Sequence, residues 1–341
     1  MNSNSKNFTT EDELQIYLNM IGDTTIEVVY PFTNTPVLKA RPEGERYSIE
    51  ISCNRECFEK MLHPIGPLYD EMPSYTDVLE CMMSSGVLRF SNYKEITESI
   101  NRVRGLKKKP WFCLDTNMLY RRFFSNFGLI DPREIVLVDT VQNEVESQLN
   151  YKYSPAQISA LKSVMPYEKH LVDELINRRM KTSRKASYFA LRELKLVRDG
   201  GAMMADAPEA SSSDKERNDQ IIAKSLRKLE KERGILAVML TADSQMIDIC
   251  NSESLESILC QMPFELPLVT DAEPARVRSL IFSLAAVFGV IRAGSTLVFS
   301  EFRGKQELDK VELLFLDNRL GEEYAKSVKI CRKLMELQIA H

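Results

Sequence analysis

Short strand-like runs, each followed by polar residues and a helix-like segment, fill the middle of this chain. The clearest are Trp111–Leu114, Glu134–Val138 and Leu236–Leu240. Alternation of strand and helix is typical of an α/β domain, in which helices cover a central parallel sheet. The continuous apolar character of Leu236–Leu240 fits a strand that is buried on both faces of such a sheet. We therefore predict an α/β domain over residues 110–270.

The segments on either side of this region have a different pattern. Residues 1–104 contain two alternating, β-branched runs, Thr24–Phe32 and Tyr47–Cys53, and several short helices. This pattern predicts a small α+β N-terminal domain. Residues 271–341 begin with an apolar helix, pass through a hairpin and end in a second helix, which predicts an α+β C-terminal extension of helix-hairpin-helix type. We expect three consecutive domains.

The charge and hydropathy of the 341-residue chain exclude some classes of protein. Its formal net charge is −4, so any contact with nucleic acid must come from local basic patches. The first residues, Met1–Asp12, lack the apolar core of a signal peptide. The longest apolar stretch, Ser279–Ile291, is shorter than the ~20 residues that span a bilayer. We expect a cytoplasmic protein without membrane association.

The cysteines support the same location. The chain has seven, and most lie in apolar surroundings, as Cys113, Cys250 and Cys331 do. This distribution is typical of reduced core thiols in a cytoplasmic protein. Cys53 and Cys57 form one Cys-x-x-x-Cys pair without a matching second pair, and the chain has only three histidines. A structural zinc site is therefore not expected.

Four acidic residues occupy strand ends or helix starts in the predicted α/β domain. Asp115 follows the first strand, and Asp243 follows the strand Leu236–Leu240. Glu144 lies in the first turns of the helix after the second strand, and Asp219 lies at the start of another helix. In a parallel sheet, strand ends and the helix starts that follow them share one edge. We expect the four carboxylates to converge there.

Converging carboxylates repel one another, and each raises the pKa of the others. A divalent cation removes this conflict. Several hard oxygen ligands suit Mg²⁺ or Mn²⁺ better than zinc. A cation held in this way can generate hydroxide and stabilise charge on a phosphoryl oxygen. The pattern therefore predicts a Mg²⁺ or Mn²⁺ site.

The same residues also fit a plainer structural role. Asp115, Asp219 and Asp243 each fit the N-terminal cap of a helix, where Asp is a favoured residue. Glu144 also fits an exposed helix position, in which case Glu146 would be the ligand. Asp139, which opens the same helix, is interpreted as a helix cap.

Four short motifs contain these acids: Leu114-Asp-Thr-Asn117, Val141-Gln-Asn-Glu144, Asn218-Asp-Gln-Ile-Ile222 and Leu240-Thr-Ala-Asp243. In type and order they resemble the four acidic motifs of the PIN-domain nuclease family. The resemblance covers residues 110 to about 270. The segment between Glu144 and Asp219 spans 219 − 144 = 75 positions, which is longer than expected for a minimal PIN domain.

This resemblance implies a three-layer α/β/α domain with a central parallel sheet. It also implies cleavage of single-stranded RNA that depends on Mg²⁺ or Mn²⁺. The residues Asp115, Glu144, Asp219 and Asp243 would then be the metal ligands. The side chains of Asn117 and Thr241 would orient the site through hydrogen bonds. A homodimer, or a regulatory protein partner, is a further expectation from the family.

Basic residues near these motifs are candidates for contacts with the RNA backbone. Arg121 and Arg122 lie about one helical turn after Asp115. The densest basic run comprises Arg178, Arg179, Lys181, Arg184 and Lys185. Such a run can bind phosphates in a salt-sensitive manner. It also fits the solvated face of a helix, and both interpretations stay open.

The sequence thus favours a metal-dependent endoribonuclease, in which a metal-activated water hydrolyses the phosphodiester bond and no protein nucleophile is needed. Two alternatives stay open. One is a catalytically silent PIN-like scaffold that binds RNA or protein. The other is a nuclease that acts on structured DNA.

Overall fold

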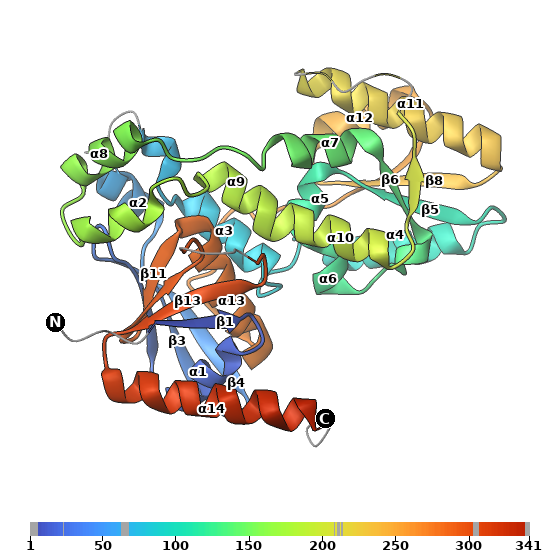
Figure 1. The fold of residues 1–341 in the computed structure, drawn as a ribbon. Coiled ribbons are helices and arrows are strands. Elements are labelled where there is room, and N and C mark those ends of the chain that lie inside the picture. Colours follow the sequence, from blue (N-terminus) through green and yellow to red (C-terminus); the bar gives the residue numbers. More distant parts are fainter. Residues whose placement is uncertain are drawn as a thin grey trace. The chain divides into compact units, whose positions relative to one another are not determined.

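The computed structural model describes residues 6–22, 24–62, 68–207, 209, 212, 214–302 and 307–337. These residues form two compact units, and each unit is assembled from separate stretches of the chain (Figure 1). The parallel-sheet unit comprises residues 88–150 and 185–265. The antiparallel-sheet unit comprises residues within 1–87, 151–184 and 266–341.

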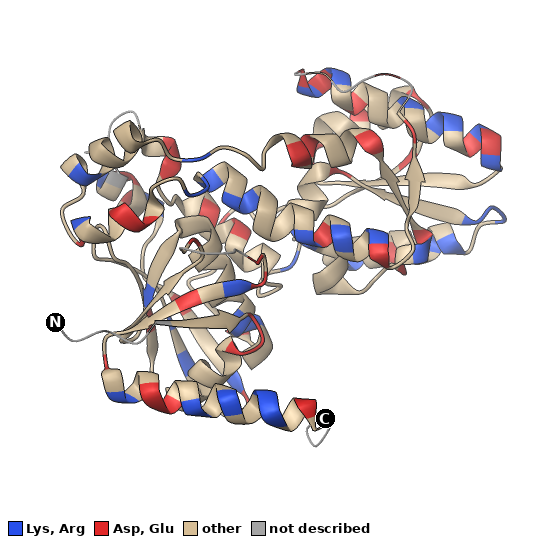
Figure 2. Cartoon of the chain, in the orientation of Figure 1, with Lys and Arg blue, Asp and Glu red and all other residues tan. Residues whose placement is uncertain are grey.

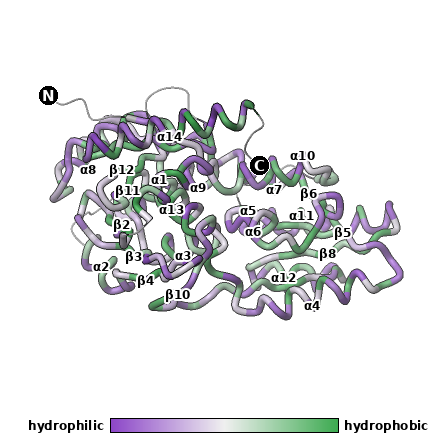
Figure 3. Tube along the Cα trace, turned by 90° about the horizontal axis from the view of Figure 1, so that it is seen from below, coloured by the Kyte–Doolittle hydropathy of each residue, from purple (hydrophilic) through white to green (hydrophobic). Residues whose placement is uncertain are grey.

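The parallel-sheet unit is built on five strands in the order β7-β6-β5-β8-β9, and all neighbours are parallel. The strands are β5 (Pro110–Leu114), β6 (Ile135–Val138), β7 (Met203–Ala205), β8 (Leu236–Thr241) and β9 (Glu256–Leu259). Every residue of β6 is buried, and so are all but the first of β8. Figure 3 shows the hydrophobic stretch of β8. Continuous apolar strands favour a parallel sheet covered on both faces.

Helices lie on both sides of this sheet, with α11 and α12 on one side and α4 and α10 on the other (Figure 1). The helical elements are α4 (Tyr93–Arg104), α5 (Thr116–Tyr120), α6 (Phe123–Phe127), η2 (Pro132–Glu134), α7 (Asp139–Ser147), η4 (Ala186–Leu191), α10 (Arg192–Asp199), α11 (Lys215–Arg233) and α12 (Ser244–Ser252). Both α6 and α11 end at a glycine in the left-handed region, Gly128 and Gly234. Glycine adopts this conformation without strain, so it stops a helix efficiently. The predicted α/β architecture is confirmed.

The antiparallel-sheet unit is built on eight strands in the order β1-β13-β12-β11-β2-β3-β4-β10. The strands are β1 (Lys6–Thr10), β2 (Ile26–Tyr30), β3 (Thr35–Glu43), β4 (Arg46–Ile51), β10 (Val269–Ala272), β11 (Val290–Ala293), β12 (Thr296–Phe299) and β13 (Lys310–Phe315). The hairpin expected near the C-terminus is present, because β12 pairs with β13 in antiparallel register.

The helices of this unit include one that is largely apolar, α13 (Pro274–Phe288). They are α1 (Leu14–Met20), α2 (Arg55–Leu62), α3 (Tyr75–Ser84), α8 (Pro155–Val164), η3 (Lys169–Leu175), α13 (Pro274–Phe288) and α14 (Asn318–Glu336), and α9 (Lys181–Lys185) begins in it. Helix α13 is buried at Val277 and throughout residues 279–288. Across the described part of the chain, no helix combines the length and the apolar character needed to cross a membrane.

The structure divides the chain differently from the three consecutive domains expected. Strands from both ends share one sheet, because β1 pairs with β13, β2 with β11 and β4 with β10. Residues 1–87 and 266–341 are therefore parts of the same unit, whereas α4 belongs to the parallel-sheet unit. Residues 151–184, within the unusually long Glu144–Asp219 segment, also belong to the antiparallel-sheet unit. Local patterns predict elements but not which distant strands pair.

Two predicted elements are wrong in detail. The charged run Tyr167–Arg198 predicts one long helix, but η3 ends at Leu175, and Asn177 adopts a left-handed conformation with φ 58° before α9 begins. The run Phe264–Val269 predicts a short strand, but strand β10 begins only at Val269. Residues 199–213 predict a low-complexity loop, of which residues 208, 210, 211 and 213 lie outside the described part of the chain.

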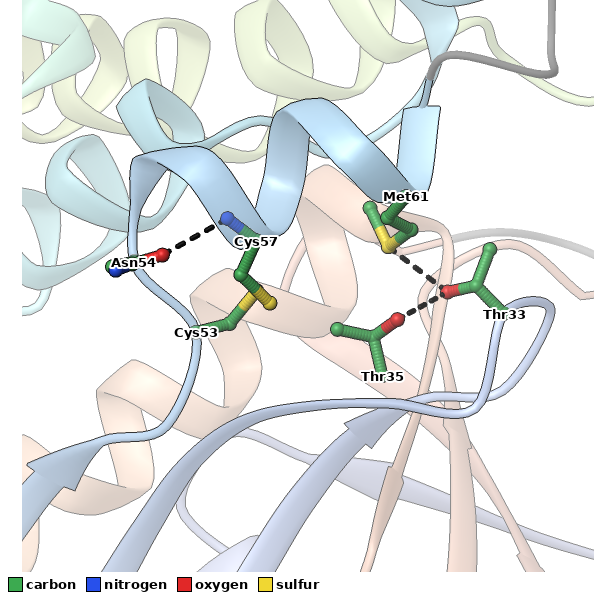
Figure 4. Close-up of a disulfide and its surroundings, with 6 residues drawn as sticks. All are labelled: Thr33, Thr35, Cys53, Asn54, Cys57 and Met61. Carbon is green, nitrogen blue, oxygen red and sulfur yellow. Dashed lines mark hydrogen bonds between the residues drawn. A yellow bond between two sulfur atoms is a disulfide. The ribbon is translucent and has the colours of Figure 1, made fainter.

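The prediction that all cysteines are reduced is also wrong. Cys53 and Cys57 form a disulfide with a Cα–Cα distance of 5.4 Å (Figure 4). Cys57 lies in the first turn of α2, where its amide donates to the side chain of Asn54 at 2.9 Å. This turn brings the two cysteines, four positions apart, within bonding distance. Cys113 and Cys250 are buried free thiols, as expected. The disulfide does not support the cytoplasmic location, which stays a prediction.

Candidate functional site

The order of strands marks one place in the parallel sheet as a natural binding site. From β5 the chain continues to β6 and β7 on one side, whereas β8 and β9 lie on the other. Ligands of open α/β sheets bind beyond the carboxyl ends of the strands, at the point where the order reverses. Asp115 directly follows β5, and Asp243 lies two residues after β8. Both therefore lie at this switch point.

Asp115 is almost completely buried, with 6% of its surface exposed. It caps α5 by accepting a hydrogen bond from the Met118 amide at 2.8 Å, and it also accepts one from the Thr241 hydroxyl. Burial raises the pKa of Asp115, while these hydrogen bonds, the charge of Arg121 and a hydrogen bond from Asn117 oppose the rise. The helix cap and the predicted site position are therefore compatible.

Thr241 links Asp115 to Asp243. Its buried hydroxyl donates to Asp115 and accepts the Asp243 amide at 2.9 Å. Asp243 caps α12 by accepting from the Gln245 amide at 3.0 Å. Its other oxygen accepts the ammonium of Lys215 at 2.6 Å, and this ion pair lowers the pKa of Asp243. The hydroxyl of Thr241 therefore connects the carboxylate of Asp115 to the backbone of Asp243.

Glu144, and not Glu146, faces the other site residues. One carboxylate oxygen of Glu144 accepts from the Thr116 hydroxyl, and the other accepts from the Asn218 side chain at 2.9 Å. Glu146 is exposed and accepts from Gln142, on its own helix, at 2.8 Å. Asp139, interpreted as a cap, is instead the first residue of α7.

Asp219 lies deeper in its helix than the sequence suggested. Helix α11 begins at Lys215 and is capped by Asp214, which accepts from the Glu216 amide at 3.1 Å. The pKa of Asp219 is raised to about 6, mainly by burial and also by the negative charges of Glu144, Asp243 and Asp115, while Lys215 opposes the rise. The four predicted carboxylates thus share one electrostatic environment.

The donor set matches the chemistry of a hard divalent cation, but the carboxylates are not arranged around one. Among the described residues, no group of three or more His, Cys, Asp or Glu side chains is placed to hold a metal ion. Protein partners satisfy Asp115, Glu144 and Asp243 separately. No hydrogen bond to the carboxylate of Asp219 is found in the described part of the chain. Burial is the largest cause of the raised pKa of Asp219, and the three neighbouring carboxylates add to it, so a cation beside Asp219 would relieve both effects.

Three residues of this cluster had no role in the sequence-based prediction. Thr116 and Asn218 hold Glu144, and Lys215 neutralises Asp243. Thr116 and Asn218 each adjoin a predicted ligand, so their position in the motifs could have indicated a role at the site. Asn218 is buried although the surrounding helix is highly charged. Lys215 carried no signal, because it lies among other charged residues.

The two arginines after Asp115 have different environments. Arg121 is half-buried and donates to the Asn117 carbonyl and to the Met262 sulfur, both at 2.9 Å. Its charge acts on Asp115, so it lies beside the carboxylates. Arg122 is only 8% exposed, and its charge opposes the rise that burial causes in the pKa of Glu193. Arg121 is therefore the better candidate for a phosphate contact.

Most of the predicted basic run serves the antiparallel-sheet unit. Arg179 pairs with Glu301 at 3.1 Å, and Lys181 pairs with Asp77 at 3.0 Å. Arg184 is buried in the core. The interpretation of these residues as an RNA-binding patch is not supported by their contacts. Arg178 and Lys185 are half-buried. Figure 2 shows how Lys and Arg distribute over the ribbon.

The raised pKa of Asp219 leads to a prediction for the metal-free protein. Its folded pKa of about 6 exceeds its usual 3.8, so the folded state binds this proton more tightly than the unfolded state. The wild type therefore loses stability as the pH rises through this range. We expect Asp219→Asn to increase the free energy of unfolding by about 1 kcal/mol at neutral pH, after allowance for solvent screening.

Urea unfolding in the presence of a chelator measures this effect. The gain should disappear below about pH 4, where the carboxyl is protonated in both states. Asp248→Asn is a matched control, because Asp248 is exposed on α12. A loss of stability in Asp219→Asn at neutral pH would contradict the electrostatic description of the cluster.

Comparison with models of known protein families gave no match for this chain, and comparison with curated proteins gave none either. The resemblance to PIN-domain nucleases stays a prediction made from the four motifs.

Proposed function

We propose that the parallel-sheet unit is a metal-dependent endoribonuclease that hydrolyses single-stranded RNA. The observation that carries this proposal is the gathering of Asp115, Glu144, Asp219 and Asp243 in one electrostatic environment at the switch point of the sheet. Structural ion-pair networks also perturb pKa values, but a raised carboxyl pKa at a ligand-binding position favours a functional site.

In this proposal the four carboxylates hold Mg²⁺ or Mn²⁺. A bound cation of this kind supplies an activated water and neutralises charge on the phosphodiester. Thr241 and Asn117 orient Asp115, and Thr116 and Asn218 orient Glu144. Arg121 provides a positive charge beside Asp115 for a phosphate oxygen. No side chain is required as a nucleophile.

A cleavage assay tests the proposal. The full chain is incubated with single-stranded RNA, single-stranded DNA of the same sequence, or flapped DNA, in Mn²⁺, Mg²⁺ or a chelator. We expect cleavage of the single-stranded RNA with either metal and none with the chelator. Preferential cleavage of flapped DNA would instead identify a structure-specific DNA nuclease.

One observation favours a second candidate function, a catalytically silent scaffold for RNA or protein. Each of three carboxylates is satisfied by protein groups, and no ready metal-binding group exists among the described residues. Isothermal titration with Mn²⁺ separates the two candidates. If the unit is a nuclease, the wild type shows a heat of Mn²⁺ binding that an Asp115 variant loses. If the unit is a scaffold, no such heat is measured.

A further inference from the structure

We propose that Lys215 is the resident counter-ion of the carboxylate cluster, and that a divalent cation binds only after displacing the ammonium of Lys215 from Asp243. This inference rests on the proposed function and describes how that site is regulated. It concerns a residue that the four acidic motifs do not include.

The contacts of Lys215 place a cation at the site. Its ammonium lies 2.6 Å from the Oδ2 atom of Asp243, the oxygen that does not cap α12. The charges of Asp243, Asp219 and Asp115 all act on Lys215, and the hydrogen bond to Asp243 is the largest cause of its raised pKa. One ammonium thus partly compensates three carboxylates that would hold the proposed metal.

The exposure of the two partners indicates that this ion pair can open. The side chain of Lys215 is 66% exposed, whereas that of Asp243 is only 19% exposed. The ammonium therefore reaches a half-buried carboxylate from the solvent, on a flexible side chain in the first turn of α11. Rotation about its side-chain bonds moves the charge into water without disturbing the helix. An exposed ion pair opens at low cost.

Arg121, a second cation beside Asp115, is less able to move. Its guanidinium already donates to the Asn117 carbonyl and to the sulfur of Met262. A divalent cation and an ammonium on the same carboxylate repel each other strongly at such short distances. Lys215 is therefore the cation that leaves the carboxylates when a metal binds.

Amine labelling of the full chain tests the displacement directly. The protein is treated briefly with an acetylating reagent, with and without Mn²⁺, and acetylation of each lysine is measured by mass spectrometry. We expect Mn²⁺ to increase labelling of Lys215 several-fold and to leave Lys224, exposed on the same helix, unchanged. Asp243→Asn should increase labelling of Lys215 without metal. Unchanged labelling of Lys215 at saturating Mn²⁺ would overturn the inference.

Mn²⁺ affinity, measured by titration calorimetry, provides a second readout. Lys215→Met removes the competing charge, so its dissociation constant should fall roughly fivefold, the scale of an exposed ion pair. Lys215→Arg should restore the wild-type value, and Lys224→Met should leave it unchanged. If wild type and Lys215→Met bind Mn²⁺ equally, the counter-ion role fails while the metal site stands. If neither binds, both proposals fail.

Discussion

Asp115→Asn is expected to reduce metal-dependent RNA cleavage by a factor of about 100 or more, the scale seen when one preorganised electrostatic group is removed from an active site. The variant loses the charge at the carboxyl end of β5. The asparagine oxygen can still accept the hydrogen bond from the Met118 amide, while its amino group replaces the oxygen that accepts from Thr241 and can instead donate to that hydroxyl. Asn and Asp are similarly good helix caps. Because burial disfavours the charged form of Asp115, stability should be maintained or increased.

Cleavage rates and thermal unfolding, measured on the same preparation, check this result. Glu146→Gln is the matched control, because Glu146 lies on α7 but is exposed and accepts a hydrogen bond from Gln142 on its own helix. It should retain wild-type activity, whereas Glu144→Gln should lose most of it. Full activity of the Asp115→Asn variant would exclude the proposed site.

Arg184→Met is expected to destabilise the antiparallel-sheet unit by about 3–5 kcal/mol, the usual cost of removing one partner from a buried charged network. Arg184 is 1% exposed. It donates to the carbonyls of Ala286 at 3.0 Å, Val287 at 2.9 Å and Arg179 at 2.7 Å. Methionine can fill much of the space, but it leaves these buried carbonyls without their donor.

The single tryptophan makes this prediction easy to localise. Trp111 lies in β5, so its fluorescence reports the parallel-sheet unit, whereas circular dichroism reports both units. In urea, Arg184→Met should show a transition in circular dichroism that precedes the change in fluorescence. Lys169→Met should behave like the wild type, because Lys169 is exposed and lies in residues 151–184, the segment that also contains Arg184. Coincident, unshifted transitions in Arg184→Met would show that the network contributes little.

The elements of the parallel-sheet unit were largely predictable from local sequence. Buried apolar runs give β6 and β8, and Gly128 and Gly234 end the helices that precede β6 and β8. The division into units was not predictable in the same way. Pairing of β1 with β13 joins segments about 300 positions apart, and hydrophobic periodicity contains no information on such partners.

The site could be predicted in outline for the same reason. Strand ends in a parallel sheet share an edge, so Asp115 and Asp243 followed from the positions of two strands. The roles of Lys215 and Arg184 could not be predicted, because a charged residue in a charged segment looks the same whether it lies in solvent, on a carboxylate or in a core. Only the contacts distinguish these cases: Lys215 forms an ion pair with Asp243, and Arg184 donates to buried carbonyls.

The pairing of strands from both ends of the chain also determines when each unit can be completed during synthesis. The chain passes between the units after residues 87, 150, 184 and 265. The last strand of the parallel sheet, β9, ends at Leu259, whereas β1 must wait for β13, which ends at Phe315. Strand β1 therefore leaves the ribosome long before its neighbour β13 has been made. The parallel-sheet unit, the proposed nuclease, can therefore fold while the antiparallel sheet still lacks its last strand.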